Sequence, residues 1–403
     1  MNYSKEEVMQ YVAEEDVKFI RLAFCDVFGK QKNISIMPDE LPKAFEHGIA
    51  FDASAIKGFG DEAHSDLFLH PDPSTLTWLP WRPEHGKVVR MFCSISCPDG
   101  KPFSCDTRTL LKSAVEEAEA LGCTFYFGAE QEFYLFELDE NNEPTRKPYD
   151  HAGYMDIAPD DKGENVRREI CLTLEQMGIM PESSHHEEGP GQNEIDFRYT
   201  EALEATDNVM TFQTVVKTIA RRNGLYADFS PKPLGDTPGN GFHINLSVRP
   251  DSFLKKLNAM TAGILDKAVP MTAFLNPSES SYRRLGKMKA PRYVTWSAEN
   301  RSQLIRVPAA ANEYRRIELR SPDPSANPYI AFTLLIKAGL SGIRSDLALP
   351  EPADFNLYTA SEETLASFTK LPGDLKQAKA AAKDDGWIKA NLPSQIIDIY
   401  CAE

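Results

Sequence analysis

The segment 239–247 alternates polar and apolar side chains, and no other feature of the sequence constrains the fold as strongly. Its polar residues include His243, Asn245 and Ser247. Residues i and i+2 of a strand lie on the same face, so the pattern predicts a strand with one polar face and one face in the core. The polar face could hold a metal ligand, although a lone histidine in such a strand is more often structural.

The other predicted elements follow one another without a regular β–α–β alternation. Helices are expected at 5–14, 106–121, 164–177, 206–223, 250–269 and 327–341, and strands at 17–25, 33–37, 87–96, 124–138, 194–199, 225–229, 241–248, 292–297 and 316–320. The remaining C-terminal residues are expected to be helical and irregular. The chain contains no GxxxxGK[ST] and no usable GxGxxG motif. We therefore predict an α+β fold without a standard phosphate-binding loop.

The turn Pro98-Asp99-Gly100 is the predicted boundary between two domains. Residues 1–100 contain one short helix and several strand-like runs, which is typical of a small α+β unit. Residues 101–403 would form the larger second domain.

Charge and cysteine content narrow the choice of partners and location. The 403 residues include 44 Lys+Arg and 60 Asp+Glu, which gives a net charge of −16. Such an acidic chain binds nucleic acid or an anionic membrane poorly, so we expect neither partner. The most apolar run, 329–340, is too short to span a bilayer. The N-terminus has no signal-peptide pattern, and seven scattered cysteines are typical of reduced thiols, so a cytoplasmic location is expected.

Two further segments concentrate carboxylates. Glu130 and Glu132 would share one face of a strand, and like charges placed side by side repel unless a cation lies between them. Glu187 and Glu194 flank a Gly-Pro-Gly turn that can fold the first back toward the second. Hard oxygen ligands of this kind fit Mg²⁺ or Mn²⁺. Taken singly, each segment also fits a solvent-facing strand or a polar hairpin.

A series of arginines follows in the last third of the chain: Arg283, Arg284, Arg301, Arg306, Arg315, Arg316 and Arg320. In an acidic protein they suggest recognition of phosphate or carboxylate by bidentate hydrogen bonds, with surface ion pairs as the alternative. Together with the carboxylates they predict a two-metal, anion-binding site suited to phosphoryl transfer.

In their order along the chain, these segments resemble the type I glutamine synthetases. The matching stretches are 51–56, 128–133, 153–154, 185–197, 231–234, 239–247, 276–285, 296–302 and 316–324. The resemblance implies an ATP-dependent ligase that joins L-glutamate and ammonia through γ-glutamyl phosphate, with two or more Mg²⁺ or Mn²⁺ ions. It also implies an N-terminal β-grasp domain and a catalytic domain with helices around a curved, mostly antiparallel sheet.

The resemblance implies a role for each matching residue. One metal would be bound by Glu132, Glu187 and Glu194, and a second by Glu130, His243 and Glu318. Glutamate would be held by Glu132, Tyr154, Gly239, Arg284 and Arg320. The nucleotide side would include Asn245, Ser247, Arg306 and Arg316. Arg301, with Arg306, would neutralise the transferring phosphate. Asp52 would reach a neighbouring subunit's site and deprotonate ammonium.

The flap segment, residues 286–291, departs from the family pattern. It is one residue shorter, and Lys289 stands where the family has a glutamate that binds and deprotonates the ammonium-derived nitrogen. A cation there repels ammonium by ~1 to 4 kcal/mol at ~4 Å, although a lysine with a lowered pKa can itself act as a base. Pro238 also replaces a family asparagine that touches glutamate. These departures keep two alternatives open: a γ-glutamyl ligase for another amine or acid, and a non-catalytic sensor.

The resemblance implies a homo-oligomer with active sites between the subunits of a six-membered ring. The chain lacks the family's C-terminal extension that grips an opposite ring, so we expect weakened or absent stacking of rings and a hexamer, with a dodecamer as the alternative. Tyr358 resembles a tyrosine that is adenylylated in some relatives, with an ordinary loop tyrosine as the alternative.

Overall fold

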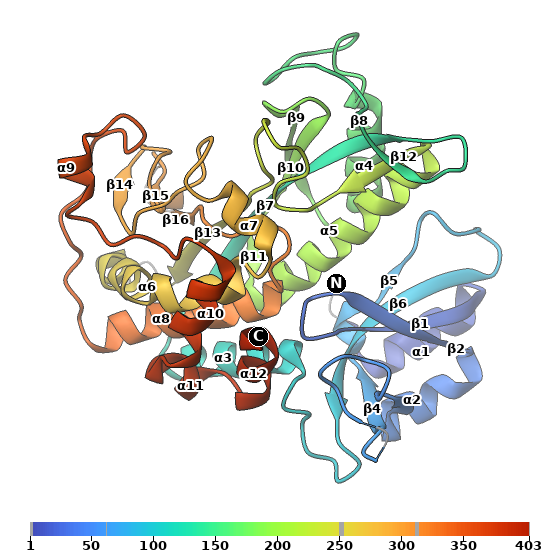
Figure 1. Cartoon of the computed structure of the whole chain (residues 1–403). Coiled ribbons are helices and arrows are strands. Elements are labelled where there is room, and N and C mark those ends of the chain that lie inside the picture. Colours follow the sequence, from blue (N-terminus) through green and yellow to red (C-terminus); the bar gives the residue numbers. More distant parts are fainter. Residues whose placement is uncertain (1–2, 62, 250–253, 311–313, 403) are drawn as a thin grey trace. The chain divides into compact units, whose positions relative to one another are not determined.

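The structure, a computed structural model, describes residues 3–61, 63–249, 254–310 and 314–402. Contacts between residues divide the chain into two units (Figure 1). The first consists of Met1–Ser113 and Glu175–Gly178, and the second of Ala114–Leu174 and Ile179–Glu403. Among the described residues, no helix has the length and apolar composition needed to cross a membrane.

The N-terminal unit contains a mixed sheet of six strands in the order β2-β1-β6-β4-β3, with β5 paired to β6. The strands are β1 (Val17–Cys25), β2 (Gln31–Ile36), β3 (Ile49–Asp52), β4 (Asp66–Pro71), β5 (Thr77–Trp78) and β6 (Lys87–Ser96). The central pair β1 and β6 is parallel, and the other pairs are antiparallel. The unit's helices are α1 (Lys5–Glu14), η1 (Pro38–Glu40), α2 (Leu41–His47) and η2 (Pro73–Thr75). Helix α1 begins at a capping box between Ser4 and Glu7, and its bounds are those predicted.

The second unit is built on a ten-stranded sheet in the order β14-β15-β16-β13-β7-β10-β9, with β8, β11 and β12 also paired to β7. Its strands are β7 (Thr124–Leu138), β8 (Pro144–Pro148), β9 (Pro181–His186), β10 (Gln192–Phe197), β11 (Thr200–Glu201), β12 (Leu225–Asp228), β13 (Phe242–Arg249), β14 (Trp296–Ala298), β15 (Ile305–Val307) and β16 (Ile317–Leu319). Every pair is antiparallel except β14 with β15. This sheet agrees with the predicted α+β class.

Helices α5 (Ala202–Arg222), α6 (Leu254–Leu275) and α8 (Pro328–Arg344) form the apolar packing on this sheet. The other helices are α3 (Thr107–Ala120), α4 (Glu164–Gln176), α7 (Glu279–Arg284), α9 (Glu362–Leu365), α10 (Leu375–Lys383), α11 (Gly386–Asn391) and α12 (Ser394–Cys401). Helices α5 and α6 contact the sheet, and α8 packs on both of them. Phe127 of β7 stacks on Phe332 of α8 at 4.0 Å between ring centroids. Because side chains alternate along a strand, Glu130 and Glu132 of β7 point to the opposite face.

The prediction of a strand over 292–297 was largely wrong, since β14 begins only at Trp296. Residues 292–294 instead exchange backbone hydrogen bonds with a C-terminal segment: Val294 donates to Thr369 and Leu371 donates to Arg292. For the helix predicted over 250–269, residues 250–253 lie outside the described part of the chain, and α6 continues past Pro270 to Leu275. Strand β9 was missed because its sequence, PESSHH, has no apolar alternation.

Candidate active site

Strand register brings acidic residues of β7 and β10 and a histidine of β13 together on the polar face of the sheet. Glu130 on β7 lies opposite His243 on β13 and also opposite Asp196 on β10. Glu132 lies opposite Glu194 on β10. Directly opposed residues share a face and lie about 5 Å apart, and like charges in such pairs are unfavourable. The sheet therefore concentrates negative charge that needs a compensating cation.

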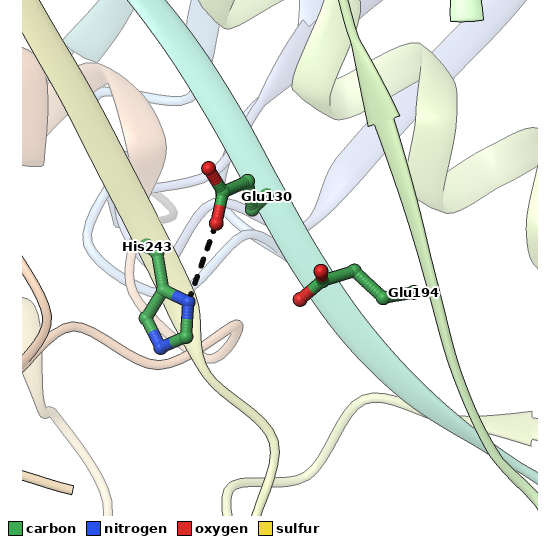
Figure 2. A group of neighbouring side chains, drawn as sticks. All are labelled: Glu130, Glu194 and His243. Carbon is green, nitrogen blue, oxygen red and sulfur yellow. Dashed lines mark ion pairs between the residues drawn. The ribbon is translucent and has the colours of Figure 1, made fainter. Parts of the chain in front are cut away.

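Two groups of potential metal ligands result, and they share Glu194. The ligand atoms of Glu130, Glu194 and His243 lie within 4.8 Å of one another, as do those of His185, Glu187 and Glu194. Figure 2 shows the first group, with the side chains converging from three neighbouring strands and His243 Nδ1 3.5 Å from Glu130 Oε2. The Gly-Pro-Gly turn folds Glu187 back toward Glu194, as predicted.

Burial and mutual repulsion raise the pKa of several of these carboxyl groups. Burial, and then the neighbouring Glu132, raise the pKa of Glu187 to about 8. Burial, and then Glu130, raise the pKa of Asp196 to about 7. The pKa of Glu194 lies well above its ordinary value because of burial and then Asp196. Burial alone would raise the pKa of Glu130, but the hydrogen bond and charge of His243 lower this pKa to about 2.

Glu318 is fully buried and faces arginines. It forms ion pairs with Arg306 and with Arg320, whose Nη1 lies 2.6 Å from Glu318 Oε1. His243 Nδ1 is 3.8 Å from the same oxygen. Within the described residues, Glu318 belongs to neither ligand group, so its role as a metal ligand stays a prediction.

The carboxylates and the arginines line a single cavity of about 500 Å³. Its predicted site residues are Glu130, Glu132, Tyr154, Glu187, Glu194, Gly239, His243, Arg284, Lys289, Arg301, Arg306, Arg316 and Arg320. Arg284 is buried and donates to the carbonyl oxygens of Ser321, at 2.8 Å, and Arg320, at 3.3 Å. Gly239 has no room for a side chain, because a Cβ there would come within 2.3 Å of the Pro231 carbonyl oxygen. One part of the cavity is therefore lined by groups that bind cations, and another part by groups that bind anions.

A second cavity of about 280 Å³ shares Glu130, Asp196 and Arg316 with the first. Asn245 and Ser247 line it, and Asn245 links Glu130 Oε1 at 2.6 Å to Arg316 Nε at 2.9 Å. Sequence reasoning missed its three tyrosines, which are Tyr126, Tyr199 and Tyr314. The alternation of β7 could have identified the first of them, since Tyr126 precedes Glu130 by four residues and shares its face.

A buried polar network, also missed from sequence, supports the β9–β10 hairpin. His186 Nε2 lies 2.8 Å from Asp150 Oδ1, which also accepts from the Gly191 amide at 3.0 Å. Arg167 pairs with Asp161 at 2.6 Å and donates to Asn193 Oδ1 at 2.7 Å. These contacts satisfy the buried charges behind the turn that carries Glu187.

Two predicted catalytic residues, Lys289 and Asp52, belong to neither of these metal-ligand groups. Lys289, in the flap segment, forms an ion pair with Glu188, and its Nζ is 5.9 Å from the centroid of the Tyr154 ring. The partner carboxylate offsets part of the repulsion toward ammonium that the sequence predicts. Asp52 belongs to the N-terminal unit, where it is exposed and accepts hydrogen bonds from Ser54 that lower its pKa.

Carboxylates and a histidine on strand faces, opposite clustered arginines, define a site for divalent cations and a phosphate-bearing substrate. Two family models match the chain: the glutamine synthetase catalytic domain over residues 104–403, and the glutamine synthetase beta-Grasp domain over residues 16–98. The chain belongs to the glutamine synthetase family, as the resemblance predicted.

Relatives and solved structures agree with this assignment. The glutamine synthetase of Clostridium saccharobutylicum is 43% identical over 415 residues, 99% of this chain and 94% of the relative. That of Staphylococcus aureus (strain Mu50) is 43% identical over 414 residues, 99% and 93% of the two chains. Apo GmaS superposes with a TM-score of 0.88 at 27% identity, covering 98% of this chain and 93% of GmaS. Plasmodium falciparum glutamine synthetase shares the fold, with a TM-score of 0.86 at 24% identity over 100% and 95% of the chains.

Proposed function

We propose that this protein is an ATP-dependent glutamate–ammonia ligase that forms glutamine through γ-glutamyl phosphate. The observation that carries the proposal is the cavity in which the carboxylates of β7 and β10 face the arginines of the C-terminal half. The two relatives described above, both glutamine synthetases, support the same reaction.

The residues present fit the ATP and divalent metal ions that the family uses. Crowded carboxyl groups with raised pKa values are stabilised when a cation replaces their protons. Asp196 Oδ1 is also buried without a hydrogen-bond partner among the described residues. One Mg²⁺ or Mn²⁺ would be held by Glu132, Glu187 and Glu194, and a second by Glu130, His243 and Glu318. Bound there, the ions would offset the negative charge of the phosphate oxygens.

The chain's own side chains would orient the two substrates. Arg284 and Arg320 would bind the glutamate carboxylates, together with Glu132, Tyr154 and Gly239. The Nε of Arg320 is buried and has no hydrogen-bond partner in the described part of the chain, which is consistent with a bound anion as its partner. Arg301 and Arg306 would neutralise the transferring phosphoryl group. Asn245, Ser247 and Arg316 would contact the nucleotide in the smaller cavity. The tyrosines of this cavity would surround the adenine base.

The reaction has two balanced steps. An oxygen of the glutamate side-chain carboxylate attacks the terminal phosphorus of ATP, and ADP leaves. Ammonia then adds to the carbonyl carbon, the bond to phosphate breaks, and the nitrogen loses a proton. Asp52, from a neighbouring subunit of a homo-oligomer, would accept the proton from ammonium. A hexameric ring is the proposed active unit, and native mass spectrometry measures its size.

Lys289 favours one second candidate, a γ-glutamyl ligase for another amine. A single assay separates the two: phosphate release from ATP with Mg²⁺ and L-glutamate, with and without ammonium, with products identified by mass. We expect glutamine and phosphate in a one-to-one ratio. Glutamate-dependent phosphate release without glutamine would overturn ammonia as the acceptor and direct an amine screen. No glutamate-dependent turnover would indicate another acid substrate or a sensor.

A further inference from the structure

The flap segment is a tight turn that projects over the larger cavity. Its amides bond locally, with Ala290 N donating to Lys287 O at 3.0 Å and Gly286 N donating to Ala290 O at 3.2 Å. Met288 and Lys289 have φ angles of 44° and 69°, a left-handed conformation that is unfavourable for residues with a Cβ. Contacts elsewhere in the protein must therefore hold the turn in this shape.

The tip of the flap segment contacts the β9–β10 hairpin across the cavity. Lys289 Nζ forms an ion pair with the Glu188 carboxylate, although the two residues are 101 positions apart in sequence. Both residues line the cavity. Glu188 directly follows the predicted metal ligand Glu187, and its amide donates to Glu187 Oε2 at 3.1 Å. The ion pair thus joins the flap to the turn that carries the carboxylates.

The base of the flap segment has a second attachment. The Tyr358 hydroxyl donates to the Ala290 carbonyl oxygen at 3.2 Å. This contact anchors one end of the segment, while the tip extends toward Glu188. Weaker contacts also reach the tip: Lys232 Nζ lies 3.9 Å from Met288 Sδ, and Lys289 Nζ faces the Tyr154 ring. Loss of the ion pair would therefore loosen the tip and leave the base in place, which is the behaviour of a hinged lid.

We propose that Glu188 is a positioning residue that latches the flap segment closed through Lys289 and so keeps water from the acyl phosphate. The proposal rests on the proposed function. When the flap opens, water adds to the carbonyl carbon of γ-glutamyl phosphate and the bond to phosphate breaks. Glutamate and inorganic phosphate are then released, so ATP is consumed without product. Both partners of the latch belong to the protein, so closure does not require a bound ammonium ion.

The strength of the pair sets the expected effect. The Lys289 side chain is 56% exposed and that of Glu188 is 37% exposed. An exposed ion pair of this kind shifts an open–closed equilibrium by about 1.5- to 5-fold. The rate of glutamate-dependent phosphate release without ammonium should rise by the same factor when the ion pair is broken. This rate should also rise with ionic strength, because salt screens exposed charges.

A double-mutant cycle tests the latch, using Glu188→Gln, Lys289→Met and the double variant at saturating Mg²⁺. One measurement is glutamate-dependent phosphate release without ammonium, and the other is hydrogen–deuterium exchange of the peptide that covers 286–291. We expect each single variant to increase both by about 1.5- to 5-fold, and the double variant to match the singles. The exposed pair Lys147–Glu137, which lies away from both cavities, supplies matched control variants.

Three results would overturn the latch. The first is unchanged hydrogen–deuterium exchange of the flap peptide in the single variants. The second is a double variant whose increase is the product of the two single increases. The third is an altered Mg²⁺ requirement confined to Glu188→Gln, which would place Glu188 in the metal site. If the wild-type protein releases no phosphate with glutamate, the proposed function fails, while the exchange measurement still decides whether the ion pair closes the flap. Glu188→Asp, which keeps the charge, should recover part of the protection.

Discussion

Replacing Glu187 by glutamine tests whether the carboxylate cluster stores repulsion that a metal ion relieves. Burial and the nearby Glu132 raise the pKa of Glu187 to about 8, from an ordinary value of 4.5. The folded protein therefore holds a proton that the unfolded chain releases above its lower pKa. It follows that the stability of the metal-free protein falls as the pH rises from about 4.5 to about 8, by about 1.4 kcal/mol per pH unit for this group.

The size of the effect follows from this shift. At about pH 7.5 the penalty on Glu187 is at most about 4 kcal/mol, because about three pH units separate that pH from the unfolded-state pKa. The glutamine variant carries no such penalty. In EDTA it should therefore melt several degrees above the wild-type protein at about pH 7.5, and the difference should shrink toward pH 5.5. Saturating Mn²⁺ should stabilise the variant less than the wild type, since one ligand charge is missing.

Differential scanning fluorimetry across this pH range, with EDTA or with Mn²⁺, measures both effects. Glu140→Gln is a matched control, because Glu140 is exposed in the turn between β7 and β8. A Glu187→Gln variant that is less stable than the wild type without metal at about pH 7.5 would refute the repulsion argument. A difference in melting temperature that does not change with pH would also refute it.

Three further predictions address other parts of the site. Gly239→Ala should lower the glutamate-dependent rate at least tenfold, because its Cβ would meet the Pro231 carbonyl oxygen at 2.3 Å; steady-state kinetics with an unchanged kcat/KM for glutamate would contradict this. Arg320→Lys should raise KM for glutamate or lower kcat, since a lysine cannot replace its paired contacts; normal values for both would remove Arg320 from the site. Asp150→Asn should destabilise the protein by about 3 kcal/mol, because it leaves His186 buried without its charged partner; urea unfolding that shows no loss would exclude a structural role for this network.

The sequence was sufficient to predict three of the strands that carry the site, β7, β10 and β13, and the polar face of β7 and β13. Strand β7 has the predicted bounds, and in β13 the residues predicted for the core, Phe242, Ile244 and Leu246, are all buried. These predictions succeeded because side-chain direction alternates with every residue of a strand, whatever the strand pairs with. The ordered motifs also identified the family, which the comparisons confirm.

Strand register could not be predicted in the same way. Asp196 was noted only as part of a strand, although it lies opposite Glu130 and faces both cavities. The order β13-β7-β10 decides this, and the three strands are separated by long stretches of chain. Residues 292–294 show the same limit, because their partners at 369–371 are distant in sequence.

The sequence by itself determined the chemistry available to this protein: carboxylates, a histidine and arginines on recognisable strands and loops, in the order of one family. The tertiary structure decided which of these groups meet, including the pairing of Lys289 with Glu188 across 101 residues. The physical reason is that side-chain direction and turn formation depend on a few adjacent residues. Strand order and contacts across a cavity depend instead on how the apolar faces of the whole chain pack together.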